Sequence, residues 1–273
     1  MQKMLALKIG TLAFGVANLA FYATAASVPA QSQSLPAQAQ SLPAATAVPV
    51  SFAHTVDAKK AKVGDTVTAK TMQVILLPGG ASIDKGTVVV GHVVAVQPFN
   101  FDPTPYAHQS PSQISIHFDK IQKGDSVIPV NLSVRAIANP IDSREAAYPH
   151  SNADADPLGM MTLIGGTSYS PLEKMIQSDD GDAIGYNRKG GVFARLIASG
   201  SSGKGTSIHC EGTDTEQSLA IFSPDACGVY GFAGDYILEN GQDGSGTFTL
   251  AVRGRSEKLY AGSTALLQVN QAK

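Results

Sequence analysis

Residues 112–134 read SQISIHFDKIQKGDSVIPVNLSV. Apolar side chains occupy every second position from Ile114 to Phe118 and again from Ile128 to Val134, with mostly polar residues between them. A period of two is typical of strands that bury one face, and the intervening Gly124-Asp125 predicts a turn. Pro129 cannot donate a ladder hydrogen bond, so we expect its strand to lie at a sheet edge or to begin there.

The same pattern continues on both sides of this stretch. Upstream, a Val-rich run at 87–96 follows Lys85-Gly86, and runs at 66–69 and 73–77 come before the Pro-Gly-Gly turn at 78–80. Downstream, strand-like runs occupy 192–197, 247–252 and 265–269. We therefore predict an all-β fold, a barrel- or sandwich-like domain of short antiparallel strands over residues 49–273. A transmembrane barrel is disfavoured because aromatic residues make up 7% of the chain and Trp is absent.

The β pattern is interrupted between its first segment, 49–138, and its second, 191–273. Residues 139–190 are predicted to be a long loop that carries one short helix at 171–177 (PLEKMIQ). Ser170 would cap this helix and Pro171 would occupy its first turn. The two β segments could form one barrel or two domains, and one barrel with its last strand beside its first is favoured.

The N-terminus predicts export. Lys3 and Lys8 form a positively charged segment before an apolar stretch at 9–22, and Ala23-Thr24-Ala25 follows that stretch. This is the pattern of a signal peptide over residues 1–25, cleaved between Ala25 and Ala26; an uncleaved anchor is the alternative. Residues 26–48 are rich in Ser, Gln, Pro and Ala, repeat QSLPA, and are expected to form a disordered linker.

Charge and cysteine content narrow the class of protein. The formal net charge is −2 and charged residues make up 15% of the chain, which argues against nucleic acid as a partner. Cys210 and Cys227 are the two cysteines, and in an oxidising compartment they are expected to form a disulfide. We expect the mature protein to lie in the periplasm or to associate with the outer membrane; release outside the cell is the alternative. No membrane span is expected after signal cleavage.

Part of the chain resembles a known family. The resemblance rests on five stretches: 62–69 (KVGDTVTA), 76–80 (LLPGG), 84–93 (DKGTVVVGHV), 116–121 (IHFDKI) and 261–269 (AGSTALLQV). In order and type they are similar to the C-terminal β-barrel domain of TrbI-type conjugation proteins. That resemblance implies a non-enzymatic scaffold of the kind found in the outer-membrane ring of type IV secretion systems. Residues 184–194 and 222–232 further resemble uncharacterised exported proteins of soil bacteria.

Motifs for catalysis or metal binding are weak. The six histidines lack H-E-x-x-H or H-x-H spacing, and His92 and His117 are expected to face solvent or a polar partner. Acidic residues at 154 and 156 and at 179, 180 and 182 suggest a solvated loop, with a Ca²⁺ site as the alternative. The 200–205 segment (GSSGKG) lacks the Ser or Thr of a phosphate-binding loop and is predicted to be a turn.

These observations favour a structural or interaction module of the cell envelope, for which we assign no catalytic residue, cofactor or metal. An envelope protein is the expected kind of partner. A module that binds a glycan or a small ligand is the second hypothesis, for which Tyr148, Tyr169 and Tyr186 offer some aromatic surface. A secreted hydrolase, with a site assembled only by folding, is the third.

Overall fold

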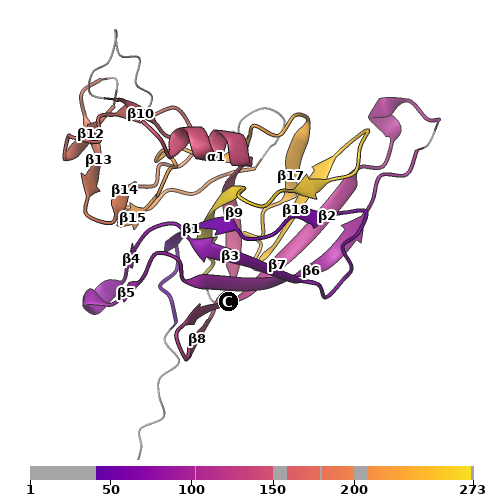
Figure 1. Ribbon diagram of the computed structural model, residues 1–273, viewed down its shortest axis with the longest axis horizontal. Coiled ribbons are helices and arrows are strands. Elements are labelled where there is room, and N and C mark those ends of the chain that lie inside the picture. Colours follow the sequence, from indigo (N-terminus) through magenta and orange to yellow (C-terminus); the bar gives the residue numbers. More distant parts are fainter. Residues whose placement is uncertain (1–40, 102, 150–158, 179, 200–207, 272–273) are drawn as a thin grey trace, which may run out of the picture. The chain divides into compact units, whose positions relative to one another are not determined.

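The computed structural model describes residues 41–101, 103–149, 159–178, 180–199 and 208–271 (Figure 1). The chain divides into two units, 1–38 and 39–273, and the described residues belong to the second. The predicted cleavage site at Ala25-Ala26, most of the predicted linker, the acidic pair at 154 and 156, and the 200–205 segment lie outside the described residues.

The described chain is built mainly of strands, as predicted, and its main sheet is a nearly closed barrel. Nine strands follow one another in the order β16-β9-β20-β1-β3-β6-β7-β18-β17, and β8 pairs with β7 off this path. Their bounds are β1 Ala47–Phe52, β3 Thr66–Thr71, β6 Val88–Gln97, β7 Ser112–Lys123, β8 Ser126–Pro129, β9 Leu132–Ala138, β16 Gly228–Tyr230, β17 Asp235–Glu239, β18 Thr247–Val252 and β20 Thr264–Val269.

The barrel joins both β segments of the sequence. The last strand, β20, pairs with the first, β1, from Ala47↔Gln268 onward. Between the two ends of the sheet, the Val134 amide in β9 donates to the Asn240 carbonyl just after β17, at 2.8 Å. Strand β1 begins at Ala47, and Ala47 and Val48 are fully buried, so the linker predicted for 26–48 ends earlier than expected.

Side chains fill the barrel interior. Phe52, Phe118 and Phe248 are almost completely buried. The ring centroid of Phe118 lies 6.2 Å from that of Phe52 and 6.1 Å from that of Phe248. Aliphatic residues from the same strands complete this core. Burial of such a cluster is the main favourable term in folding, and it leaves the interior as a packed core.

The longest hairpin, β6–β7, bends where its ladder is irregular. The register shifts between Val90 and Gly91 and again between Val93 and Ala95. A Cβ added at Gly91 would lie 2.2 Å from the His117 carbonyl oxygen, so the two backbones approach more closely than any other residue would allow. Bulges of this kind increase local twist and help a sheet to close.

A second sheet covers part of the barrel. Its strands run in the order β12-β13-β14-β15, with bounds Met175–Gln177, Ala183–Arg188, Gly191–Arg195 and Glu216–Ser218. Gln217 Oε1 accepts a 2.8 Å hydrogen bond from the Ala47 amide, and Gln73 Nε2 donates to the Val192 carbonyl at 2.6 Å. An apolar cluster that includes Leu219 and Phe222 packs against Leu266 of β20. Strands β1, β9 and β20 are therefore buried on both faces.

The remaining elements are short. The two-stranded pairs are β2 Val56–Asp57 with β19 Lys258–Leu259, β4 Ile75–Leu76 with β5 Ser82–Ile83, and β10 Met161–Thr162 with β11 Ser168–Tyr169. The helical segments are the 3-10 turns η1 Pro78–Gly80 and η2 Tyr106–His108 and the α-helix α1 Pro140–Ala146.

The predicted helix at 171–177 is wrong. Met175–Gln177 forms β12 and pairs with β13, so tertiary pairing overrides the local helix signals. The helix of this region is α1, which begins after Asn139. The Asn139 side chain accepts a hydrogen bond from the Asp142 amide, and Pro140 occupies the first turn. The predicted loop 139–190 thus contains α1 and β10 to β13.

A buried arginine and a disulfide hold the covering segments together. In the β9–β20 ladder Ala136 pairs with Leu266 and Val134 with Leu267, so Arg135 is the extra residue of a bulge. Arg135 is fully buried, and its guanidinium donates to the carbonyl oxygens of four residues: Ile197, Glu211, Pro224 and Ala226. The predicted Cys210–Cys227 disulfide is present within the same set of loops.

We predict that the Cys210→Ser/Cys227→Ser variant is less stable. The bridge closes a loop with a sequence separation of 17 residues, so its loss should lower the free energy of unfolding by about 3 kcal/mol. Urea denaturation with and without a reducing agent measures this effect. Reduction should shift the wild-type midpoint and leave the variant unchanged; an unchanged wild-type midpoint would contradict the prediction.

Candidate functional site

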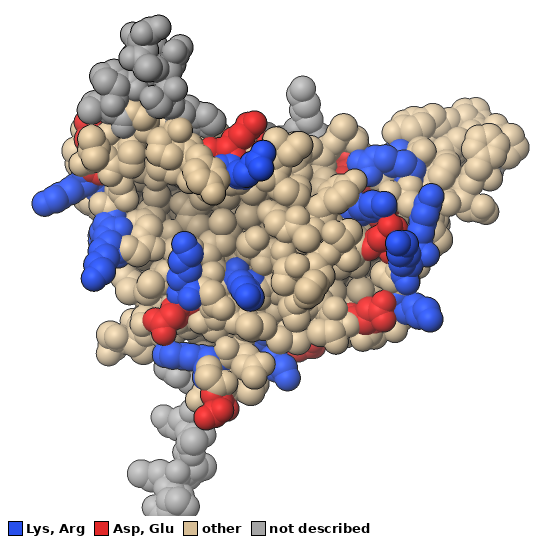
Figure 2. Space-filling model, in the orientation of Figure 1, with Lys and Arg blue, Asp and Glu red and all other residues tan. Residues whose placement is uncertain are grey.

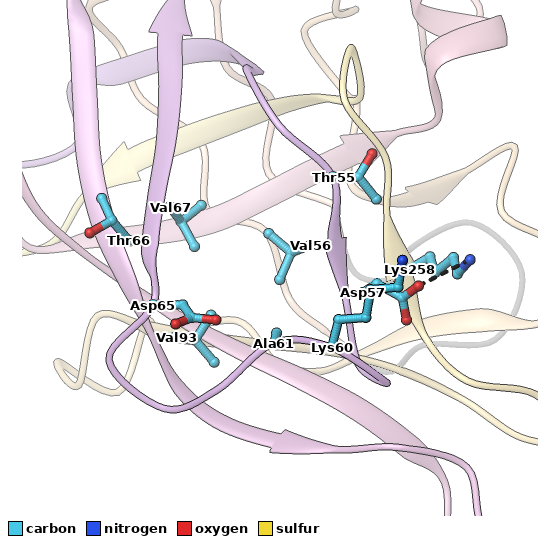
Figure 3. A pocket seen from close by; sticks show the side chains of 10 residues that line it. All are labelled: Thr55, Val56, Asp57, Lys60, Ala61, Asp65, Thr66, Val67, Val93 and Lys258. Carbon is cyan, nitrogen blue, oxygen red and sulfur yellow. Dashed lines mark ion pairs between the residues drawn. The ribbon is translucent and has the colours of Figure 1, made fainter.

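A polar pocket of about 380 Å³ lies beside the β2–β19 pair. Figure 3 shows its lining side chains, which come from β2 and the residues around it, from β3, from Val93 of β6 and from Lys258 of β19. Its charged residues are Asp57, Lys60, Asp65 and Lys258, so the two signs are balanced.

The Asp57–Lys258 ion pair forms one wall of this pocket, with 3.1 Å between Oδ2 and Nζ. Burial alone would raise the pKa of Asp57. The hydrogen bond from the Lys59 amide and the nearby Lys258 ammonium outweigh burial and hold that pKa below its usual value. Asp57 is therefore ionised at neutral pH. A solvent-accessible pair of this kind orients the two strands but adds little stability.

A histidine pair lies on β6 and β7. His92 and His117 are opposite each other in the ladder, with ring centroids 5.8 Å apart. Asp119 Oδ2 lies 2.9 Å from His92 Nδ1, and Asp119 Oδ1 lies 3.9 Å from His117 Nε2. The expected polar partner is thus Asp119. Within the described part of the chain, no three His, Cys, Asp or Glu side chains are placed to hold a metal ion.

The β12–β13 hairpin has the most exposed apolar and aromatic side chains of the second sheet. Met175 and Tyr186 are paired across the hairpin and are 39% and 44% exposed, and nearby Leu172 is 74% exposed. A groove of about 520 Å³ is lined by Leu172, Glu173, Lys174, Tyr186, Arg188 and Lys189, among others. We define the Tyr186 face as Leu172, Lys174, Met175, Tyr186, Arg188 and Lys189.

Arg188 fixes the geometry of the Tyr186 face. Its guanidinium carbon lies 5.3 Å from the centroid of the Tyr186 ring and 5.4 Å from that of Phe193, and the guanidinium also pairs with Glu216. Stacking over aromatic rings restrains both partners. Figure 2 shows Lys and Arg side chains along the side of the visible face where Figure 1 places β12 to β15.

The three tyrosines considered from the sequence do not form one platform. Tyr169 is buried in a small cluster with Ile176 and Val192, and burial raises its pKa. Tyr148 is 63% exposed and follows α1, whereas Tyr186 lies on β13. The structure therefore leaves Tyr186 as the aromatic residue associated with a groove.

Two buried carboxyl groups were missed from the sequence. Asp235 begins β17 and Glu257 precedes β19; they are 3% and 0% exposed. Neither stands in a recognisable motif, and the chain brings them together only by folding. The one local signal was an acidic residue next to apolar strand residues, as in Asp235-Tyr236-Ile237.

No protein-family model matches this chain, and no curated protein or solved structure is significantly similar to it. In the described residues no helix has the length and apolar character needed to span a membrane.

We predict that Lys258→Met raises the pKa of Asp57. The substitution removes the ammonium and its hydrogen bond. The remaining influences are burial, which raises that pKa, and the Lys59 amide hydrogen bond and the Lys60 charge, which lower it. A pH titration of the Asp57 carboxyl by ¹³C NMR in the wild type and the variant measures the shift. A matched change at a remote lysine, Lys120→Met, should leave the titration unchanged; a shift there, or none in Lys258→Met, would contradict this assignment.

Proposed function

We propose that this protein is an exported, non-enzymatic β module that binds another protein of the bacterial cell envelope. The observation that supports this best is the contrast between a barrel filled by side chains and the exposed Tyr186 face. The barrel interior has no room for a ligand between Phe52, Phe118 and Phe248. Recognition is then left to the surface, where loops and short strands held by a rigid scaffold usually carry it.

The Tyr186 face suits an acidic protein segment with apolar side chains. With the groove beside it, this face combines three cationic residues, Lys174, Arg188 and Lys189, and one acidic residue, Glu173, with an exposed Tyr, Met and Leu, so positive charge is in excess. Tyr, Met and Arg are enriched at the centre of protein interfaces. Arg188 is held in place by Tyr186, Phe193 and Glu216, so little side-chain entropy is lost there on binding.

Further support comes from the compartment. The N-terminal signal pattern and the Cys210–Cys227 disulfide both suit an exported protein. The resemblance of five stretches to secretion-system scaffold barrels supports a structural role in the envelope, with the periplasm or the outer membrane as the site of action.

One observation favours the glycan- or small-ligand alternative. A pocket of about 430 Å³ at one end of β9 and β20 is lined by Ser133, Gln242, Gln268, Asn270 and Gln271, among others. Amide groups both donate and accept hydrogen bonds, as sugar hydroxyls require. The hydrolase alternative has weaker support, because His92 and His117 contact Asp119 and not a serine or cysteine.

We predict that Tyr186→Ser/Lys189→Glu abolishes partner binding. In-cell crosslinking in the native host, followed by co-purification, should recover a defined envelope partner with the wild type. The variant removes the exposed ring and reverses one charge of the Tyr186 face, so recovery should fall at least about tenfold if both residues lie at the interface centre.

Tyr148→Ser is the matched control, because Tyr148 is an exposed tyrosine outside the Tyr186 face. It should retain the partner. Recovery of the wild type as a free monomer would refute the module function, and equal recovery of the Tyr186→Ser/Lys189→Glu variant would move the interface elsewhere.

A further inference from the structure

Asp235 and Glu257 form a carboxyl pair inside the protein. Asp235 lies at the start of β17, where it pairs with Val252 of β18, and Glu257 lies in the connection from β18 to β19. Their exposed fractions, 3% and 0%, are far below those of ordinary acidic residues. Ionised carboxylates are costly to bury unless every oxygen has a donor.

Two of the four carboxyl oxygens have donors. Asp235 Oδ1 accepts a hydrogen bond from the Arg255 guanidinium, and Glu257 Oε1 accepts one from the Lys258 amide at 2.8 Å. Among the described residues, no donor serves Asp235 Oδ2 or Glu257 Oε2, and both atoms are buried. The two carboxyl groups are nevertheless within hydrogen-bond reach of each other.

A single proton held between the carboxyls resolves this deficit, because a protonated carboxyl donates to an ionised one. The pKa values agree with this arrangement. Burial, together with the neighbouring Asp235 charge, raises the pKa of Glu257 to about 8. Burial also raises the pKa of Asp235, to about 6, against the lowering effect of Arg255. At neutral pH the pair therefore holds one proton and one negative charge, opposite one guanidinium.

The segment that carries Glu257 is fastened through the same residue. The Glu257 amide donates to Ser112 Oγ at 2.9 Å, and its carbonyl accepts from the Ala58 amide at 3.0 Å. The next residue, Lys258, pairs with Asp57 in the wall of the pocket of Figure 3. Displacement of Glu257 would therefore detach both β19 and that wall.

We propose that Asp235 and Glu257 form a proton-operated latch, which holds residues 253–259 on the barrel while the pair binds one proton and releases them when that proton leaves. The latch is independent of the proposed partner binding. The group that it binds is a proton. Loss of that proton separates β19 from β2 beside the 380 Å³ pocket.

Other charged or titratable groups lie on the elements next to the pair. They are Arg255 of its own segment, Asp57, Lys59, Lys60 and Lys258 at the β2–β19 pair, Arg253 and Tyr236 beside β18 and β17, and Tyr106 against Gly254. Of these side chains, Arg255 is the one that acts electrostatically on both carboxyls. Arg255 is itself 43% exposed, so water reaches the rim of the pair.

The sign of the effect follows from linkage. Both carboxyls bind protons more tightly in the closed state than when solvated, where their ordinary pKa values are 3.8 and 4.5. Their contribution to the closed state is therefore fully present below about pH 4 and is lost as the pH rises through about 8. Alkaline conditions should open the latch, and acidic conditions should close it.

Hydrogen exchange of the backbone amides at 253–259 tests this proposal. After correction for intrinsic exchange, the opening constant in the wild type should rise about tenfold per pH unit between pH 6 and pH 8, as expected for one proton lost on opening. In Glu257→Gln the amide supplies the missing donor without a proton, so this rise should disappear. Glu145→Gln, at an exposed acid of α1, is the matched control and should keep the wild-type dependence.

A wild-type segment whose corrected exchange is independent of pH, or a Glu257→Gln variant that retains the rise, would overturn the latch. Should Glu257→Gln not fold, ¹³C titration of the Glu257 carboxyl in the wild type decides. Titration above pH 7 supports the shared proton, and titration near the ordinary value of 4.5 refutes it. Neither outcome depends on the identity of a protein partner, so failure of the latch leaves the proposed function untouched.

Discussion

The hydrogen bonds of the Arg135 guanidinium are the interactions on which the packing of the loops against the barrel depends. It projects from a bulge in β9 and satisfies carbonyl oxygens in three separate loop regions, at 197, at 211 and at 224 and 226. Burial lowers its pKa to about 10, so it remains charged at neutral pH. An unpaired buried cation would be very costly. Equally, four carbonyl groups, those of Pro224 and Ala226 buried, would lose their donor if Arg135 were removed. The buried guanidinium therefore needs the loop carbonyls as acceptors, and the loops need the guanidinium as their donor.

This arrangement explains why so much irregular backbone is ordered. The segment 219–226 packs on β1, β9 and β20 and encloses their outer faces, while the disulfide joins its end to Cys210. The second sheet continues from this cover through β15. The barrel is the rigid scaffold, and segment 219–226 and the second sheet form additional surface on top of it. The Tyr186 face lies on the second sheet. The buried carboxyl pair lies at the barrel, between the start of β17 and the β18–β19 connection.

Period-two alternation predicted the strands well where one face is solvated, as in β7, with Ile114, Ile116 and Phe118 inside. The disulfide was also predictable, because the N-terminal signal pattern predicts an oxidising compartment, where two cysteines are expected to pair. Local signals failed where tertiary contacts dominate. Ser170-Pro171 resembles a helix start, but the residues after it pair with β13. Arg135 stands in an apolar run and gives no hint of its four acceptors, and the Asp235–Glu257 pair joins residues that no sequence spacing connects.

The pairing of β1 with β20 has a consequence for biogenesis. It joins Ala47 with Gln268, residues more than 200 positions apart, so the barrel cannot close until synthesis has passed β20. Contacts this distant in sequence slow folding, because a long loop must be ordered before they form. The β6–β7 hairpin can form early, but the closed barrel must form last.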